Sequence, residues 1–124
     1  MAEKNETGKI GEETACSFLR INGYTILETN WRYRHYELDI IASDGNELVV
    51  VEVKTRSETY RVAPEDTVSR KKIQRIVAAA DAYILHKNIS LPVRFDIICM
   101  VRQGISYVVE RHIEDAFFAP VNYR

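Results

Sequence analysis

The sequence has few cysteines, prolines and glycines, and it has no excess of charge of one sign. Its 124 residues include two Cys, three Pro and five Gly, and 17 Lys and Arg stand against 18 Asp and Glu, giving a formal net charge of −1. This balance excludes a polybasic protein that holds nucleic acid by gross positive charge, although a locally basic face stays open. Cys16 and Cys99 are far apart and form no CxxC pair, so neither a zinc site nor a disulfide framework is indicated.

Long apolar runs are also missing. No segment approaches the ~20 apolar residues that cross a bilayer, and residues 1–7 are polar, without the apolar core of a signal peptide. We therefore expect a cytoplasmic protein with no membrane association. The length allows one domain, which we place at residues 8–118, between a polar N-terminal lead-in at 1–7 and a C-terminal tail at 119–124.

Several common catalytic signatures are absent. The sequence contains no GxxxxGK[ST], GxGxxG or GxSxG motif, so a nucleotide-binding loop and a nucleophile elbow have no support. The three histidines, His35, His86 and His112, show no metal-ligand spacing, and we assign them no role. Any chemistry must therefore come from carboxylates and basic side chains.

The apolar periodicity predicts an α/β fold with the element order αβββαββ. Helices are expected at 8–22 and 67–87, strands at 24–33, 37–42, 47–55, 93–101 and 105–109, a loop at 56–66, and a short helical tail at 115–118. The turn Asp44-Gly45-Asn46 predicts a hairpin between the second and third strands. This order favours a mixed sheet of four to five strands flanked by helices.

The third predicted strand carries charged residues where a strand buried on both faces should be apolar. Residues 48–51 are four consecutive apolar residues, which is typical of a strand buried on both faces. Glu52 and Lys54 follow, and they share one face because side chains alternate along a strand. Buried charges are costly unless they are paired or bind a metal. Taken alone, such a triplet more often marks a solvated hairpin face on which Lys54 merely pairs with Glu52.

The neighbouring strand supplies a second carboxylate, Asp39. If the hairpin is centred between Gly45 and Asn46, Asp39 lies directly opposite Glu52, whereas a register centred on Asp44-Gly45 makes them diagonal neighbours. In either register the two carboxylates come close enough to share a divalent cation. Lys54 is then placed to stabilise an attacking hydroxide or the charge that develops on a phosphate.

The first helix offers a third acid. Glu12 shares a face with Ala15, Cys16 and Leu19 and should point toward the core, whereas Glu13 should be solvated. Glu12 is thus a candidate ligand or orienting group. An ordinary acidic residue in the first turn, favoured by the helix dipole, explains it as well.

The second helix begins with cations at the positive end of its dipole, where they are unfavourable unless an anion binds there. From residue 54 to residue 75, seven basic residues stand against three acidic ones. We predict that the following residues bind nucleic acid: Arg56, Arg70, Lys71, Lys72 and Arg75. A solvated and slightly destabilised helix end is the alternative.

The segment 31–36, with the sequence Trp-Arg-Tyr-Arg-His-Tyr, alternates rings and cations. Such a pattern can grip a nucleic acid strand by stacking. More often, aromatic residues of this kind are half-buried strand residues, and the sequence leaves both interpretations open.

Taken together, these segments resemble one known family. The sequence Gly-Lys-Ile-Gly-Glu-Glu-Thr-Ala at 8–15, Asn-Trp-Arg at 30–32, Glu-Leu-Asp-Ile-Ile-Ala at 37–42, Val-Glu-Val-Lys-Thr-Arg at 51–56, Val68 to Lys72 and Arg-Phe-Asp at 94–96 look like the YraN family. That family is functionally uncharacterised and is placed in the restriction-endonuclease-like PD-(D/E)xK superfamily, near the archaeal Holliday-junction resolvases. The resemblance runs in order over nearly the whole chain.

The resemblance implies a restriction-endonuclease-like core with a Mg²⁺ or Mn²⁺ site. Asp39 matches the metal-binding aspartate, Glu52 the second acid and Lys54 the catalytic lysine of the superfamily. Glu12 matches the glutamate on the first helix of the resolvase branch, and Lys72 the lysine that usually begins the second helix. The sequence departs from the family pattern at Tyr36, which replaces a glycine, and in the loop after residue 56, which lacks one.

We therefore expect a metal-dependent endonuclease that hydrolyses DNA, with branched or damaged DNA as the candidate substrates and with Glu12, Asp39, Glu52 and Lys54 as the catalytic set. The resolvase relatives act as dimers, so a homodimer is an expectation that follows from the resemblance. The alternative is a non-catalytic DNA-binding or repair-accessory module with the same fold.

Overall fold

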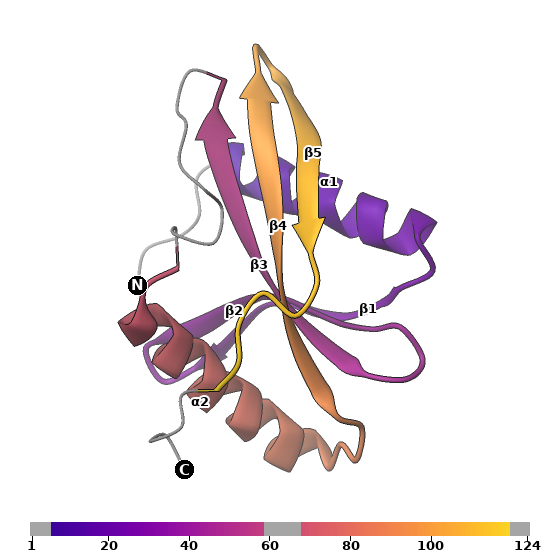
Figure 1. The fold of residues 1–124 in the computed structure, drawn as a ribbon, viewed down its shortest axis with the longest axis vertical. Helices are drawn as coiled ribbons and strands as arrows, with labels where there is room; N and C mark the ends of the chain where they lie inside the picture. The colour runs from indigo at the N-terminus through magenta and orange to yellow at the C-terminus, as the bar shows by residue number, and fades with distance from the viewer. Residues whose placement is uncertain (1–5, 59–67, 120–124) are drawn as a thin grey trace.

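The sheet has five strands that lie in chain order. The computed structural model describes residues 6–58 and 68–119 (Figure 1). The elements are α1 (Glu6–Ile21), β1 (Thr25–Tyr33), β2 (Tyr36–Ser43), β3 (Leu48–Ser57), α2 (Arg70–Lys87), β4 (Val93–Gln103) and β5 (Ser106–Ile113). All neighbouring strands are antiparallel except β3 and β4, which are parallel and joined through α2. The predicted α/β class, the mixed sheet and the order αβββαββ are confirmed.

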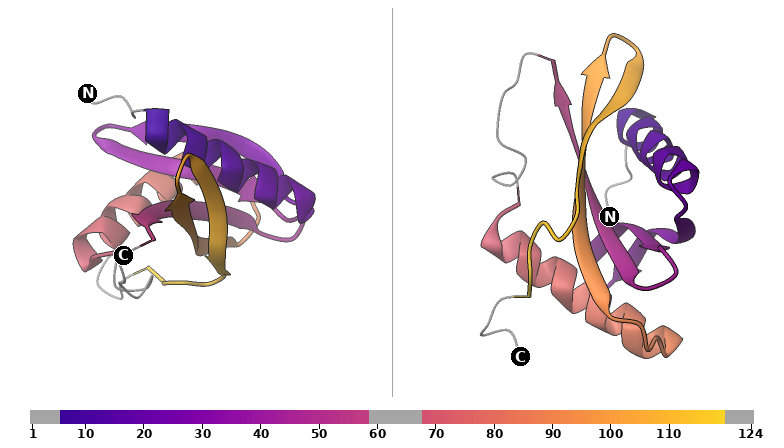
Figure 2. Two further views of the ribbon diagram at one scale, coloured as in Figure 1. Left: turned by 90° about the horizontal axis from the view of Figure 1, so that it is seen from above. Right: turned by 45° about the vertical axis from the view of Figure 1, so that its right-hand side comes forward.

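The two helices cover opposite faces of this sheet (Figures 1 and 2). Against α1 lies one apolar core, formed by Ala15, Cys16, Leu19, Ile40, Ala42, Val49, Val51, Ile98 and Met100. Against α2 lies the other, whose buried members include Ile41, Leu48, Val50, Ile76, Val77, Ala80, Tyr83, Phe95 and Ile97. Strand β3 is central and contributes to both cores, which explains its run of consecutive apolar residues. Within the described residues, neither helix is long and apolar enough to cross a membrane.

The ends of the elements follow local signals in the sequence. Helix α1 begins two residues earlier than predicted. Helix α2 begins at Arg70, three residues later than predicted, because the Ser69 side chain accepts the Lys72 N–H at 3.1 Å and caps the helix. Most of the predicted loop at 56–66 lies outside the described residues, as do the tail beyond residue 119 and most of the lead-in.

The predicted helix at 115–118 is wrong. Asp115 has a φ of 52°, in the left-handed region, and the chain beyond it is not helical. The Ala116 N–H instead donates to the Phe95 carbonyl at 2.8 Å, and the Phe117 ring stacks on the Phe95 ring with centroids 5.3 Å apart. Packing against β4 outweighs the weak helical preference of this short segment.

A buried ionic network lies on the α1 side of β4, centred on Arg94 and Asp96. Asp96 is fully buried and accepts two hydrogen bonds from Arg94, both at 2.9 Å, and one from His112 at 2.7 Å. Arg94 also donates to the Tyr24 hydroxyl at 2.7 Å. Burial alone raises the pKa of Asp96, but the hydrogen bonds from His112 and Arg94 outweigh it and hold that pKa below its ordinary value.

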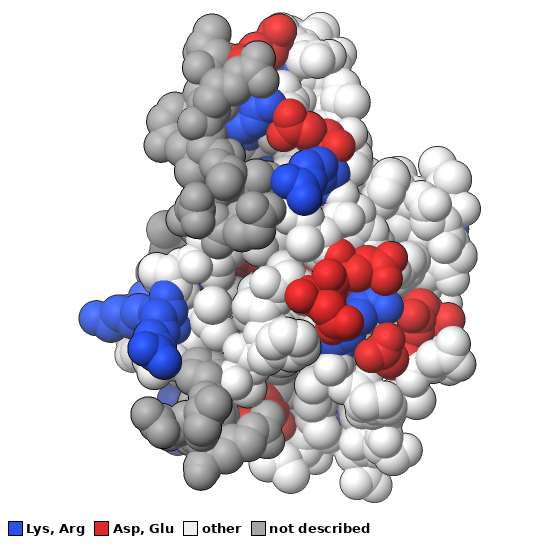
Figure 3. All heavy atoms as spheres, viewed as in Figure 1, with Lys and Arg blue, Asp and Glu red and all other residues white. Residues whose placement is uncertain are grey.

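Acidic side chains surround the outer edge of this network. Asp44 and Glu47 of the β2–β3 turn lie 3.2 and 3.3 Å from the Arg94 guanidinium, and Glu114 lies 3.6 Å from it. Figure 3 shows acidic groups gathered around basic atoms on one part of the surface. The network therefore joins the β2–β3 turn, the start of β1 and the end of β5 to the central strands.

We expect Asp96→Asn to lower the free energy of unfolding at pH 7 by about 3 kcal/mol, because it removes the fully buried carboxylate that accepts two hydrogen bonds from the buried Arg94 guanidinium. The folded-state pKa of Asp96 is depressed, so its contribution exists above the ordinary pKa and is lost as the pH falls. Urea titrations at pH 7 and pH 3.5 should show the deficit shrinking at the lower pH. Glu114→Gln is the control: its carboxylate is 59% exposed, and it should cost below about 1 kcal/mol. Equal losses from both variants would refute the role of Asp96.

Candidate active site

The site lies where β2 separates from β3. The two strands pair from Ser43↔Leu48 to Ile40↔Val51, so the register continues to Asp39 opposite Glu52. This is the first of the two registers considered from the sequence. Beyond this point β3 continues beside β4 as far as Ser57, and the Asp39 carboxylate accepts the Val53 N–H at 2.9 Å. A side chain thus satisfies a backbone donor of β3 that β2 no longer reaches.

Glu52 is the centre of the charge cluster. It lies beside Ile97 on β4, whereas Lys54 lies beside Cys99, and both of these neighbours belong to the core against α2. The Glu52 side chain is 6% exposed. Its Oε2 atom lies 3.6 Å from the Lys54 Nζ atom and 3.4 Å from the Lys72 Nζ atom of α2. Two ammonium groups from different elements therefore meet on one buried carboxylate.

The environment of Glu52 raises its pKa from 4.5 to about 7. Burial is the largest cause, and the neighbouring Asp39 carboxylate adds to it through its charge and a hydrogen bond. The Lys72 and Lys54 charges oppose the rise without cancelling it. Near neutral pH the pair Asp39–Glu52 therefore carries more negative charge than its surroundings stabilise, and an added cation would relieve it.

The donor set of this pair fits a hard divalent cation. Carboxylate oxygens are the ligands that Mg²⁺ and Mn²⁺ prefer, and Mg²⁺ is often held by only one or two protein carboxylates, with waters and substrate phosphates completing its shell. Within the described ranges, the structure brings no three His, Cys, Asp or Glu side chains into a group able to hold an ion. Asp39 and Glu52 alone would offer a cation two carboxylates, so waters and substrate oxygens would have to supply its remaining ligands.

Glu12 is buried but lies apart from this group. It is 7% exposed and Glu13 is exposed, as the helical facing predicts. It belongs to α1, on the opposite face of the sheet from Glu52, and lines a hollow of about 460 Å³ together with Thr29 and Asn30 of β1. At the preceding position, an added Cβ on Gly11 would lie 3.3 Å from the Thr55 hydroxyl, so α1 runs close against the end of β3 here. A role for Glu12 stays a prediction.

Four of the five predicted nucleic-acid-binding residues lie on the first turns of α2, and the fifth, Arg56, lies on β3. Lys72 contacts Glu52, and Arg75 is exposed one turn further along α2. Arg70 and Lys71 are exposed on the first turn, where Figure 3 shows basic side chains projecting from the surface. Three of the ten charged residues counted between positions 54 and 75, namely Arg61, Glu65 and Asp66, lie outside the described residues.

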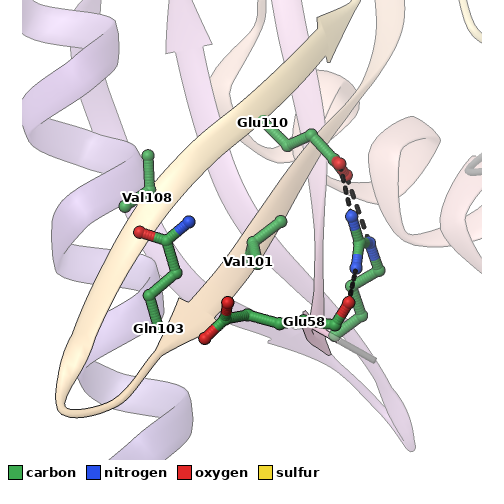
Figure 4. A pocket seen from close by; sticks show the side chains of 6 residues that line it. Glu58, Val101, Gln103, Val108 and Glu110 are labelled. Carbon is green, nitrogen blue, oxygen red and sulfur yellow. Dashed lines mark hydrogen bonds and ion pairs between the residues drawn. The ribbon is translucent and has the colours of Figure 1, made fainter. Parts of the chain in front are cut away.

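Arg56 has a different environment from the other predicted phosphate ligands. Its guanidinium pairs with both carboxylate oxygens of Glu110 on β5, and its Nε atom lies 3.2 Å from the nearer one (Figure 4). It also donates to the Ser57 and Glu58 carbonyls, at 2.8 and 3.4 Å. This pair borders a hollow of about 240 Å³ at the far end of the sheet. Arg56 thus links β3 to β5 and does not join the Glu52 group.

Sequence reasoning did not assign a role to two other sets. The first is Arg94 and Asp96. They are ionisable residues on a strand that is otherwise apolar, and the criterion that identified Glu52 and Lys54 would have identified them too. The second is Arg32 and His35, which line a hollow beside Lys72. The alternation of rings and cations at 31–36 was the available signal, but it did not indicate which side chains turn outward.

We expect Glu52→Gln to stabilise the protein more at pH 8 than at pH 5. The folded-state pKa of Glu52 is raised, so its ionisation destabilises the fold progressively as the pH rises from about 4.5 through about 7. The neutral amide avoids this cost, and we expect a gain of about 2 kcal/mol in the free energy of unfolding at pH 8, with little gain at pH 5. Thermal and urea unfolding measure it. Glu13→Gln, at a solvated glutamate, should show no such pH-dependent gain, and a pH-independent effect of Glu52→Gln would contradict the prediction.

Comparison with known proteins places the chain in a family. The family model described as "Uncharacterised protein family UPF0102" matches residues 11–100. A UPF0102 protein of Parabacteroides distasonis is 55% identical over 120 residues, which cover 97% of this chain and 98% of that protein. A UPF0102 protein of Phocaeicola vulgatus is 50% identical over 98% of this chain and 99% of its own length, and one of Flavobacterium psychrophilum is 46% identical over 95% and 98%. The chain therefore belongs to the uncharacterised protein family UPF0102, which is the YraN family that its motifs resemble.

Proposed function

We propose that this protein is a Mg²⁺- or Mn²⁺-dependent endonuclease that hydrolyses phosphodiester bonds in branched or damaged DNA. The observation that carries the proposal is the Glu52 carboxylate, which is buried next to Asp39 and contacted by two lysines. A fold gains no stability from two adjacent carboxylates on neighbouring strands, one of them buried, and such conflicts are concentrated at functional sites. The superfamily that the sequence resembles uses the same residue types for metal-dependent hydrolysis of DNA.

In this proposal Asp39 and Glu52 hold the metal. A bound Mg²⁺ or Mn²⁺ supplies Lewis-acid polarisation of the phosphate and lowers the pKa of a water molecule. The protein holds both ligands rigidly: Glu52 extends from the central strand, and the Val53 N–H fixes Asp39 at 2.9 Å. Such support keeps the two carboxylates in place before substrate arrives.

Lys54 is the residue we assign to the reacting water and the phosphate. Its side chain is 32% exposed, so the Nζ atom reaches solvent from a position 3.6 Å from Glu52. From there it can orient the attacking water, help to deprotonate it and offset the charge that develops in the transition state. Lys72 and Arg75 would hold the backbone phosphate, with Arg70 and Lys71 as outer contacts. A role for Glu12 rests on the resemblance alone, and we assign it no contact with the metal, because α1 carries it on the opposite face of the sheet from Glu52.

Cleavage of a panel of linear, flapped and four-way DNA, with Mg²⁺, with Mn²⁺ and with EDTA, tests this function. We expect metal-dependent cutting that Glu52→Ala, Asp39→Asn and Lys54→Ala each reduce at least about 100-fold, because each removes a metal ligand or transition-state charge. Glu12→Gln tests the resemblance separately: a loss of about 10-fold would support a role in ordering water, and an unchanged rate would limit the catalytic set to Asp39, Glu52 and Lys54. Each variant should first be shown to retain the wild-type circular dichroism spectrum.

Two outcomes would overturn the assignment. Cutting that survives both Glu52→Ala and Lys54→Ala belongs to another site or to a contaminant. Salt-sensitive DNA binding with no metal-dependent cutting on any substrate would select the alternative, a DNA-binding or repair-accessory module with this fold.

DNA binding itself should depend on the first turn of α2. Because each phosphate contact releases about one counterion, the double variant Arg70→Gln/Lys71→Gln should weaken binding to any duplex sequence and reduce the slope of log K against log salt by about 1 to 2. Fluorescence anisotropy in EDTA at several salt concentrations measures both quantities. Lys87→Gln removes a cation from the other end of the same helix and should leave the slope unchanged. If Lys87→Gln weakened binding as much as Arg70→Gln/Lys71→Gln, DNA binding would not be localised to the first turn of α2.

A further inference from the structure

A hollow of about 340 Å³ lies next to the candidate active site, between the tip of the β1–β2 hairpin and the first turns of α2. Arg32, His35 and Tyr36 line it from the hairpin, and Lys72 and Arg75 line it from the helix. We refer to it as the hairpin hollow. Its volume is at the lower end of the range for pockets that hold small molecules.

The charge of the hairpin hollow favours an anion. Three basic side chains line it, Arg32, Lys72 and Arg75, whereas Glu37 is the one carboxylate among its lining residues. Glu37 lies 3.7 Å from the Arg32 guanidinium and offsets its charge, and Glu52, outside the hollow, lies 3.4 Å from the Lys72 Nζ atom and offsets a second. Arg75 is exposed and pairs with no carboxylate within 4.0 Å in the described part of the chain. A phosphate entering here would meet the Arg75 guanidinium from one wall and Arg32 from the other.

The hairpin adds aromatic surface to this charge. Trp31 and Tyr33 pack against the core on the α2 side, which confirms the half-buried interpretation for them. Arg34 adopts a φ of 58° at the hairpin tip, and the next residue, His35, is exposed. Tyr36 is half-buried and its ring centroid lies 6.4 Å from that of Tyr33, which holds it in place. The exposed imidazole and the braced phenol ring thus offer stacking surfaces inside a cationic hollow.

Lys72 connects the hairpin hollow to the reactive carboxylates. It lines the hollow, and its Nζ atom lies 3.4 Å from the Glu52 carboxylate. Glu37 lies on β2, the strand that also carries Asp39, and is two residues before it. A group bound in the hollow therefore lies one side chain away from the place assigned to the scissile phosphate.

We propose that the hairpin hollow binds one unpaired nucleotide of a DNA strand, with its phosphate on Arg75, Arg32 and Lys72 and its base against His35 and Tyr36. The assignment rests on the proposed function, since it adds a substrate class to that site. In a duplex the bases are stacked inside the helix and cannot enter a small hollow, whereas an unpaired base is free to do so. The substrate is therefore DNA in which single-stranded nucleotides adjoin the cleaved bond, as at a flap or a branch.

The test is the binding of a fluorescein-labelled ten-nucleotide oligothymidylate and of a ten-base-pair duplex, both in EDTA so that no cutting occurs. We expect His35→Ala to weaken oligothymidylate binding about tenfold and duplex binding less than about twofold, because stacking needs an unpaired base. Arg75→Gln should weaken both, because phosphates are present in both. Lys87→Gln, an exposed cation at the far end of α2, is the matched control and should change neither.

The outcomes separate this inference from the proposed function. If oligothymidylate binding is undetectable, or if His35→Ala affects single strand and duplex equally, the nucleotide site is refuted even when the protein cuts DNA. If His35→Ala selectively weakens single-strand binding, the hollow is a nucleotide site even when no substrate is cut.

Discussion

Everything proposed for this protein depends on one unfavourable placement, the burial of the Glu52 carboxylate in the central strand of the sheet. The strand is dry because it lies between two apolar cores, and that position removes the water that would otherwise solvate the charge. Asp39 is brought beside it by the hairpin register, and Lys54 and Lys72 approach it from the same face. The pKa of Glu52 is raised because the charges of these two lysines only partly offset the effects of burial and of the Asp39 carboxylate.

The divergence of β2 from β3 makes this placement possible. If the two strands stayed paired, backbone hydrogen bonds would fill the space beside Glu52 and the Val53 N–H would have a backbone partner. Asp39 takes that donor instead, at 2.9 Å, so its carboxylate is fixed at the opening between the strands. On the other face, the Arg94–Asp96 network ties the β2–β3 turn to β4 and β5 through Asp44, Glu47 and His112. The two ionic clusters thus differ in kind. The buried Asp96 carboxylate accepts hydrogen bonds from Arg94 and His112 that hold its pKa below the ordinary value, whereas the pKa of the buried Glu52 carboxylate is raised despite its two lysine neighbours.

The sequence was informative where one physical rule dominated. Period-two alternation and a dry strand were enough to predict the fold class, the five strands and the shared face of Glu52 and Lys54, and the hairpin turn limited Asp39 to two registers. It was less informative where long-range packing decided. The segment 115–118 packs beside β4 instead of forming a helix, because Ala116 and Phe117 contact Phe95. The Arg56 guanidinium pairs with Glu110, 54 residues away, which no local pattern indicates. The hairpin hollow likewise needs the β1–β2 tip and α2 side by side, and only the tertiary structure places them so.

The near-zero net charge now has a physical interpretation. Acidic groups collect on the α1 side around Arg94 and, as the pair Asp39–Glu52, at the opening of the sheet, while cations collect at the start of α2 and on the β1–β2 hairpin. A net charge of −1 gives no long-range attraction for polyanions, so any attraction must come from the local cationic groups, whose fields are screened beyond about one Debye length. Under the proposed function, DNA would therefore be held only where it reaches the start of α2 and the hairpin hollow. That restriction would favour DNA whose unpaired nucleotides reach the hairpin hollow and the carboxylate pair together, without base-specific contacts.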